Sequence, residues 1–239
     1  MQINQLKNLL YEFGDNVRFE HDLKKKNWFN IGGKAKVFYK ANNLIELIEF
    51  LKKLEDKEKI FILGAGSNTL ITDNLFNGVV IKLSRDFNNI SLLNDEIVIA
   101  GSGVLDKTLS EFAMKNNLSG FEFLSCIPGT VGGGIKMNAG CFGNEFRDIL
   151  LSIQAIDKNG KVITISSKDI DFGYRNNNLP DNLIFLSASF KGIKSDYKKI
   201  NSQISRYKNE KEKNQPSKIK TSGSTFKNPI QQTKKKFGN

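Results

Sequence analysis

The chain has 239 residues, of which 39% are hydrophobic and 10% aromatic, and this composition suits a folded protein rather than a disordered one. Its formal charge of +11 lies almost wholly in residues 194–239, where 13 Lys and Arg stand against 3 Asp and Glu. Such a basic segment can attract nucleic acid or small polyanions such as nucleotide diphosphates, or it can simply be solvated.

Several classes of protein are excluded by what the sequence lacks. No apolar run approaches the roughly 18 residues of a membrane span, and the first residues do not resemble a secretory signal. Cys126 and Cys141 are too few for a disulfide scaffold and lack metal-ligand spacing, so we expect two inert, reduced thiols in a cytoplasmic protein. No nucleic-acid-binding motif is recognisable, and we expect neither a nucleic-acid partner nor a membrane.

In the first half of the chain, helices and short strands are mixed. Helical spacing of apolar residues predicts a helix over residues 2–13 that stops at Gly14. Asn43 and Glu46 resemble a capping box that opens a second helix. Short apolar runs predict strands at Lys34–Tyr39, Ile60–Leu63, Val79–Leu83 and Ile97–Ala100.

The second half continues this pattern. Apolar spacing from Leu105 predicts a helix ending near Gly120. Asn159-Gly160 favours a hairpin with positive φ at both turn positions, between strands at Ile153–Ile156 and Val162–Ile165. A strand at Leu183–Phe190 and a charged helix at Ser195–Lys213 follow. Helices and strands do not alternate strictly, which favours an α+β fold over a doubly wound parallel sheet.

A run of glycines interrupts this second half. Five glycines fall within twelve positions, and they are Gly129, Gly132, Gly133, Gly134 and Gly140. Because glycine weakens helices and strands alike, the cluster indicates backbone brought close to something flat or anionic. Tight turns and close packing between elements explain such a cluster equally well.

A second glycine-rich segment, Gly64-Ala-Gly66-Ser-Asn68, follows an expected strand. The third glycine of a dinucleotide fingerprint is missing, and residues 70–73 look extended rather than helical, so we reject that motif. Such a loop can still offer several backbone N–H groups to a pyrophosphate. Ser67 and Asn68 could add side-chain hydrogen bonds.

Five segments, taken in order, resemble one enzyme family. They are Asn30–Ala35, Gly64–Asn68, Ile127–Gly140, Phe172–Arg175 and Gly223–Pro229. Together they are similar to the UDP-N-acetylenolpyruvoylglucosamine reductase family, shorter type. The resemblance implies a two-lobed FAD-binding domain of the vanillyl-alcohol-oxidase (PCMH) type plus an incomplete α+β substrate domain. We expect an N-terminal helical segment at 1–27, the FAD domain at 28–193 with lobes about 28–92 and 93–193, and the substrate domain from 194 to 239.

The resemblance also implies a reaction. An NADPH-dependent flavoprotein oxidoreductase with non-covalent FAD would reduce the enolpyruvyl ether of UDP-N-acetylglucosamine to UDP-N-acetylmuramate. This step belongs to peptidoglycan precursor synthesis, and thus to cell-wall biogenesis, cell shape and cell division. We expect a monomer.

Site residues follow from the matching motifs. Arg175 would stabilise the negative charge that develops beside the substrate carboxylate, and Ser224 would donate the proton. Tyr174, Lys227 and Asn228 would bind substrate. The expected cofactor-binding residues are Gly64, Ala65, Gly66, Ser67, Asn68, Ile127, Pro128, Gly129, Thr130, Gly132, Gly133, Asn138 and Gly140. Ordinary roles exist for each: a surface arginine, a serine in a turn, a buried turn asparagine.

The resemblance ends before the chain does. The family continues past Phe-Lys-Asn-Pro to a segment that carries a third catalytic residue, a glutamate, whereas residues 231–239 do not resemble the family. We therefore expect a C-terminally truncated chain in which FAD binding survives better than turnover. The alternatives are a catalytically impaired flavoprotein fragment and another flavin oxidoreductase of the same fold.

Overall fold

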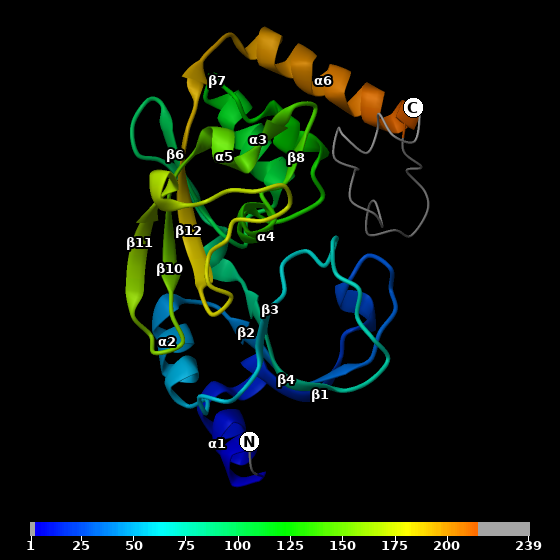
Figure 1. The fold of residues 1–239 in the computed structure, drawn as a ribbon, viewed down its shortest axis with the longest axis vertical. Coiled ribbons are helices and arrows are strands. Elements are labelled where there is room, and N and C mark those ends of the chain that lie inside the picture. Colours follow the sequence, from blue (N-terminus) through cyan, green and yellow to red (C-terminus); the bar gives the residue numbers. More distant parts are fainter. Residues whose placement is uncertain (1–2, 215–239) are drawn as a thin grey trace.

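The computed structural model describes residues 3–214, which form two stacked lobes (Figure 1). The sheet of the N-terminal lobe has the strand order β1-β2-β4-β3, in which only the β1–β2 pair is antiparallel. Its strands are β1 (Val17–Asp22), β2 (Lys34–Ala41), β3 (Ile60–Ile62) and β4 (Phe76–Leu83). Two helices accompany this sheet, α1 (Ile3–Phe13) and α2 (Leu44–Lys52).

The C-terminal lobe holds a five-stranded antiparallel sheet in the order β11-β10-β12-β6-β5. Its strands are β5 (Ile90–Leu92), β6 (Ile97–Gly101), β10 (Leu150–Ile156), β11 (Val162–Ser166) and β12 (Ile184–Lys191). The helices of this part are α3 (Asp106–Lys115), α4 (Val131–Lys136), α5 (Phe146–Ile149) and α6 (Tyr197–Asn214). Two small ladders join β7 (Leu118–Ser119) to β13 (Ile193–Lys194) and β8 (Gly140–Cys141) to β9 (Asn144–Glu145).

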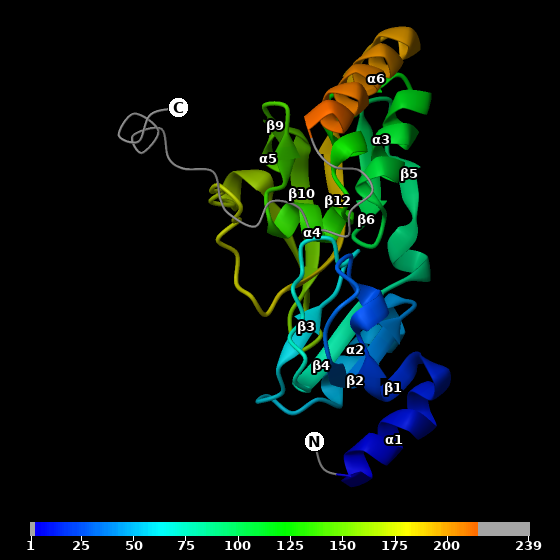
Figure 2. The same ribbon diagram turned by 90° about the vertical axis from the view of Figure 1, so that its right-hand side faces the viewer.

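Short 3-10 turns complete the chain path and connect several of these elements. They are η1 (Gly14–Asn16), η2 (Lys24–Lys26), η3 (Arg85–Asn88), η4 (Glu122–Cys126) and η5 (Ser167–Asp169). Figure 2 shows α6 lying across the outer end of the C-terminal lobe, with α3 beneath it. No helix within residues 3–214 is long and apolar enough to cross a bilayer.

One of the hydrophobic clusters joins the two lobes. Val37, Tyr39 and Ile81 of the first sheet belong to the same buried cluster as Ile184 and Leu186 of β12. Because successive side chains of a strand point to opposite faces, Phe38 and Val80 fall on the other face, in a separate cluster beneath the loops that follow β1 and β3. The loop-covered face of the first sheet is therefore distinct from its helix-covered face.

Most of the expected elements are present, and the α+β prediction is confirmed. The first helix ends at Phe13 and is followed by Gly14 at φ +51°, as expected. The Asn43 Oδ1 accepts a hydrogen bond from the Glu46 N–H at 2.9 Å, so the predicted cap of α2 forms. Residues 70–73 are not helical. The charged helix after residue 195 is α6, and it buries Ile200 and Ile204.

Two local expectations were wrong. The β10–β11 hairpin does not place positive φ at both turn positions, since only Gly160 adopts it, at +82°. Asp157 organises a longer connection instead, because its Oδ1 accepts from the N–H groups of Asn159 and Lys161 at 2.9 Å each. The helix from Leu105 was expected to end near Gly120, but α3 already ends at Lys115, and Leu118 and Ser119 pair with β13 as β7.

Candidate functional site

The two glycine-rich segments meet where the lobes adjoin. Figure 1 shows the segment after β3 rising toward α4 of the other lobe. A β-carbon added at Gly64 would lie 2.7 Å from the Thr130 Oγ1, so the two segments touch at these residues. Thr130 is buried and is the N-cap residue of α4. Segments more than sixty residues apart in the sequence therefore border one place, as a shared cofactor site requires.

The loop at residues 64–68 presents unused backbone donors. No acceptor within residues 3–214 is recorded for the N–H groups of Ala65, Ser67 and Asn68. Gly66 adopts φ +68° and approaches the Lys26 carbonyl so closely that any side chain there would collide with it. The Gly66 carbonyl in turn accepts from the Trp28 N–H at 3.0 Å. The loop is thus held from one side while its amides remain open on another.

Four of the five glycines in the second run each pack closely against a different neighbour. An added β-carbon would meet the Asp106 carboxyl at Gly129, Ser102 at Gly132, Phe146 at Gly134 and the β9 backbone at Gly140. Gly133 is exposed, and its added β-carbon would meet only the Thr130 Oγ1, at 3.5 Å. Close packing between elements therefore explains four of the five glycines. Gly133 alone offers open backbone surface.

Contacts of the α4 segment fix its position. The Val131 N–H donates to the Val104 carbonyl and the Gly132 N–H to the Ser102 carbonyl, each at 2.9 Å. At the turn before it, Gly129 N–H donates to the Ile127 carbonyl at 3.1 Å, and Pro128 is exposed. The backbone that precedes Gly133 is therefore tied to the end of β6 and the residues following it.

Asn138 joins three segments around Arg175. Its side chain is buried, with Nδ2 donating to the Gly173 carbonyl at 3.3 Å and Oδ1 accepting from the Arg147 N–H at 3.2 Å. The Arg175 guanidinium donates to the carbonyls of Asn138 and Gly140, both at 3.4 Å. Asn138 and Arg175 adopt left-handed backbone, at φ +38° and +58°. A binding role for Asn138 remains a prediction, while its hydrogen bonds support the arginine segment.

The residues beside Arg175 extend this arrangement. Its guanidinium carbon lies 5.0 Å from the centroid of the half-exposed Tyr174 ring, a cation–π distance. Asn177 is fully buried and donates from Nδ2 to the Ile135 carbonyl at 3.3 Å, which attaches the segment to α4. The structure therefore brings Arg175 and Tyr174 to the side of the molecule that carries the second glycine run. Ser224, Lys227 and Asn228 lie outside the described residues.

Sequence reasoning missed a buried acid. Asp106, at the start of α3, is fully buried, and neither of its carboxyl oxygens has a hydrogen-bond partner in the described structure. Burial raises its pKa well above the ordinary value, which favours the neutral acid. Its position beside Gly129 was not recognisable, because the signal, an Asp after Leu105, also fits an ordinary helix start.

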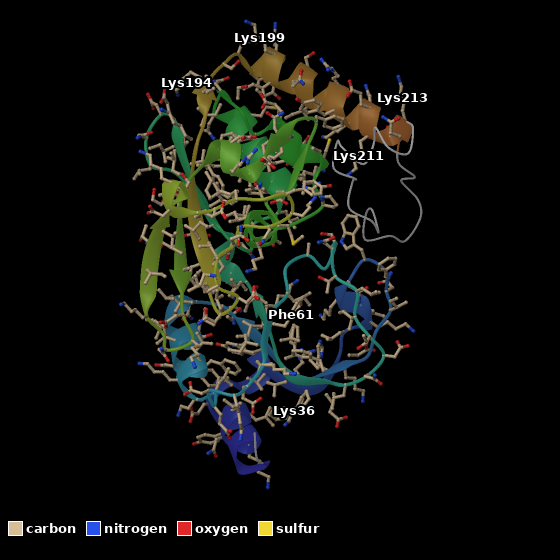
Figure 3. All side chains as sticks on the ribbon, viewed as in Figure 1. Lys36, Phe61, Lys194, Lys199, Lys211 and Lys213 are labelled. Carbon is tan, nitrogen blue, oxygen red and sulfur yellow. The ribbon has the colours of Figure 1, made fainter. Side chains whose placement is uncertain are left out.

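The two cysteines are free thiols, one buried and one partly buried. Cys126 is buried, and the Cys141 Sγ donates to the Phe123 carbonyl at 3.2 Å. Burial, reinforced by Cys126, raises the pKa of Cys141 to about 12. No cluster of three metal-ligating side chains is found among residues 3–214. Figure 3 shows Lys211 on the inner side of α6, where its Nζ donates to the Cys126 carbonyl at 2.5 Å.

The family model described as FAD binding domain matches residues 35–166. The UDP-N-acetylenolpyruvoylglucosamine reductase of Pelagibacter ubique is 58% identical over 236 residues, which cover 99% of this chain and 78% of the relative. The enzyme of that name from Rickettsia typhi is 44% identical over 211 residues, covering 88% of this chain and 71% of the relative.

Solved structures agree with these matches. The UDP-N-acetylenolpyruvylglucosamine reductase of Thermus caldophilus superposes with a TM-score of 0.79 at 30% identity, covering 89% of this chain and 76% of the other. P-cresol methylhydroxylase superposes with a TM-score of 0.55 at 14% identity, and the match covers 80% of this chain and 43% of the other. At this identity, the likeness shows a shared fold alone. The chain therefore belongs to the UDP-N-acetylenolpyruvoylglucosamine reductase family and carries its FAD-binding domain.

Proposed function

We propose that this chain binds FAD without a covalent bond and uses NADPH to reduce the enolpyruvyl ether of UDP-N-acetylglucosamine to UDP-N-acetylmuramate, a step of peptidoglycan precursor synthesis. The observation that carries the proposal is the contact between the Gly64 loop and Thr130. Through this contact, the Gly64 loop and the segment of Thr130 border the same place, where we locate the FAD site. The names of the relatives supply the substrate class.

The residues present suit FAD in two ways. The open N–H groups of Ala65, Ser67 and Asn68 match the many acceptors of a diphosphate, and amides in a turn form concave anion sites. Gly133 is exposed and lacks a side chain, so a flat ring could approach its backbone closely. When bound, FAD would accept a hydride from NADPH and supply it to the substrate.

Arg175 is the described residue best suited to the substrate's charge. Hydride addition to the terminal enolpyruvyl carbon leaves negative charge on the adjacent carbon and its carboxylate. A cation held in place before the reaction lowers the energy of such a charge without reorganisation. The Arg175 guanidinium meets this condition, since two carbonyls and the Tyr174 ring orient it. We assign proton donation to Ser224, and substrate contacts to Tyr174, Lys227 and Asn228.

The test uses the full 239-residue chain. Purified protein should be yellow, and NADPH absorbance at 340 nm should decrease only when the enolpyruvyl sugar nucleotide is added. Arg175→Met should retain the flavin and lose turnover by roughly 100-fold or more, as for removal of one group that stabilises a developing charge. Yellow protein without turnover under any condition would refute the reductase proposal and leave a flavin-binding protein. Colourless protein that binds no added FAD would refute both.

We further propose that the enzyme works as a cytoplasmic monomer, as the sequence led us to expect. Size-exclusion chromatography with light scattering should give a mass near 26.9 kDa. A stable dimer at micromolar concentration would contradict this part of the proposal, without bearing on the chemistry.

A further inference from the structure

Lys82 is a half-buried cation that has no acidic partner in the described part of the chain. It lies on β4 between Ile81 and Leu83, whose side chains belong to the helix-covered core, so Lys82 points to the loop-covered face of the sheet. Its Nζ donates to the Gly64 carbonyl at 3.1 Å. Neither Lys82 nor Lys26 forms an ion pair with any residue in the range 3–214.

Lys26 adds a second positive charge to this place. Its Nζ lies 5.6 Å from the centroid of the Phe38 ring, on the loop-covered face. The pKa of Lys82 is lowered, mainly by burial and to a smaller extent by the positive charge of Lys26. Two like charges without a counter-charge raise the free energy of the ligand-free protein, and this unfavourable term disappears when an anion binds.

The anion would lie against the Gly64 loop. Lys82 contacts the first carbonyl of this loop, and the open amides of Ala65, Ser67 and Asn68 follow directly. Ammonium and amide donors around one turn match a group with several negatively charged oxygens. A riboflavin moiety has no such group, a mononucleotide flavin has one phosphate, and FAD has a diphosphate.

We propose that Lys82, with Lys26 beside it, provides the counter-charge for the diphosphate of FAD and makes this chain selective for FAD over flavins without a diphosphate. The inference rests on the proposed function, because it assumes that FAD is the flavin bound. It assigns a role to two residues that lie in none of the glycine-rich motifs.

The experiment compares the affinities of two flavins for the ligand-free full chain. FAD and riboflavin are titrated in parallel, and binding is followed by flavin fluorescence and by quenching of the single tryptophan, Trp28. Lys82→Met should weaken FAD binding by roughly tenfold or more, the effect of losing a hydrogen bond to a charged group. Its affinity for riboflavin should change by less than about twofold. Lys82→Arg should retain most of the FAD affinity.

The control is Lys191→Met, which removes the same charge at the exposed end of β12. It should leave both affinities unchanged. Melting temperatures of the ligand-free proteins report folding, and Lys82→Met should melt at or above the wild-type temperature because an uncompensated charge is removed. Should Lys82→Met fail to fold, two other measurements replace it: the FAD affinity of Lys26→Met, and the salt dependence of flavin binding by the wild type. In the wild type, FAD affinity should fall as salt is added, while riboflavin affinity should not.

The outcomes separate the two proposals. An unchanged ratio of FAD to riboflavin affinity in folded Lys82→Met, or a salt-independent ratio in the wild type, would overturn the role of Lys82 alone. Wild-type protein that binds neither flavin would overturn the proposed function. ADP should compete with FAD for the wild type and compete more weakly for Lys82→Met, because ADP carries the diphosphate without the flavin.

Discussion

Replacing Asn138 with alanine tests whether its hydrogen bonds hold Arg175 in position for the reaction or only add to the stability of the fold. The substitution removes both side-chain hydrogen bonds and leaves the Arg147 N–H unpaired, while the Gly173 carbonyl keeps the bond that it accepts from the Asn176 N–H at 3.3 Å. Leaving a buried polar group unpaired costs about 1–3 kcal/mol, and alanine in left-handed backbone adds about 1 kcal/mol relative to glycine or asparagine. A combined local cost of about 2–4 kcal/mol is below the usual 5–15 kcal/mol of a folded domain, so the protein should still fold.

The local cost should appear as disorder of the segment that carries Arg175. We expect kcat to fall roughly 10- to 100-fold, because about 1.4–2.7 kcal/mol of lost transition-state stabilisation, about two-thirds of the local cost, corresponds to that range. The FAD dissociation constant should change much less. Asn138→Gly removes the same hydrogen bonds without the backbone strain and should lose about 1 kcal/mol less stability.

A matched control is Asn42→Ala, which removes another buried amide, one that donates to the Asn16 Oδ1 at 3.0 Å in the N-terminal lobe. It should lower the melting temperature and leave kcat unchanged. The reasoning fails if Asn138→Ala retains wild-type kcat at comparable destabilisation. A selective loss of FAD affinity at unchanged kcat would instead assign Asn138 to the cofactor site, as the sequence motif suggested.

Three further predictions concern other parts of the molecule. Gly64→Val should force Thr130 away and raise the FAD dissociation constant at least tenfold, because overpacking costs about 1–3 kcal/mol. A dissociation constant equal to that of the wild type, measured by flavin fluorescence, would contradict this. Asp106 has a raised pKa, so its contribution to stability is complete below its unfolded pKa of 3.8 and is lost as pH rises through its folded pKa. Urea unfolding should therefore show that the free energy of unfolding of Asp106→Asn rises relative to that of the wild type between pH 4 and 8, by up to about 1.4 kcal/mol per pH unit. A constant difference between the two proteins over this range would refute this. Cys141, with a pKa of about 12 against an ordinary 9.0, should have a thiolate fraction roughly 1000-fold below normal at pH 8. Mass spectrometry after iodoacetamide treatment should find it unmodified while the protein is folded, and alkylation at the rate of free cysteine would show that it is exposed.

Local signals predicted the elements whose cause is local. Gly14 ends α1 and Asn43 caps α2, because a turn or a cap depends on a few neighbouring residues. The motif order led to the family and to the meeting of the two glycine-rich segments. The hairpin after Asp157 was predicted in the right place with the wrong turn, since the Asp157 carboxylate competes with the two-residue turn that Asn-Gly favours.

Features that depend on partners far along the chain were not predictable. The helix α4 lies inside the glycine run, where propensity argues against any helix, and it forms because Val104 and Ser102 accept its first N–H groups. The roles of Lys82 and Asp106 depend on which loop covers them after folding. Neither residue belongs to a recognisable motif. Within residues 3–214, Asp106 is distinguished by a buried carboxyl without a hydrogen-bond partner, and Lys82 by a half-buried ammonium that bonds a carbonyl but no acid.

The contacts of the second glycine run explain why so flexible a sequence can hold a cofactor. Each missing side chain lets a different element approach the backbone: α3 through Asp106, the segment after β6 through Ser102, and α5 through Phe146. A chain segment packed on several sides loses the freedom that its glycines would otherwise give it. The exposed surface at Gly133 is therefore presented by a rigid backbone, and a rigid, side-chain-free surface binds a flat ring with little loss of conformational entropy. Substituting any of the packed glycines should accordingly reduce FAD affinity, because an added side chain would push a neighbouring element away and move Gly133.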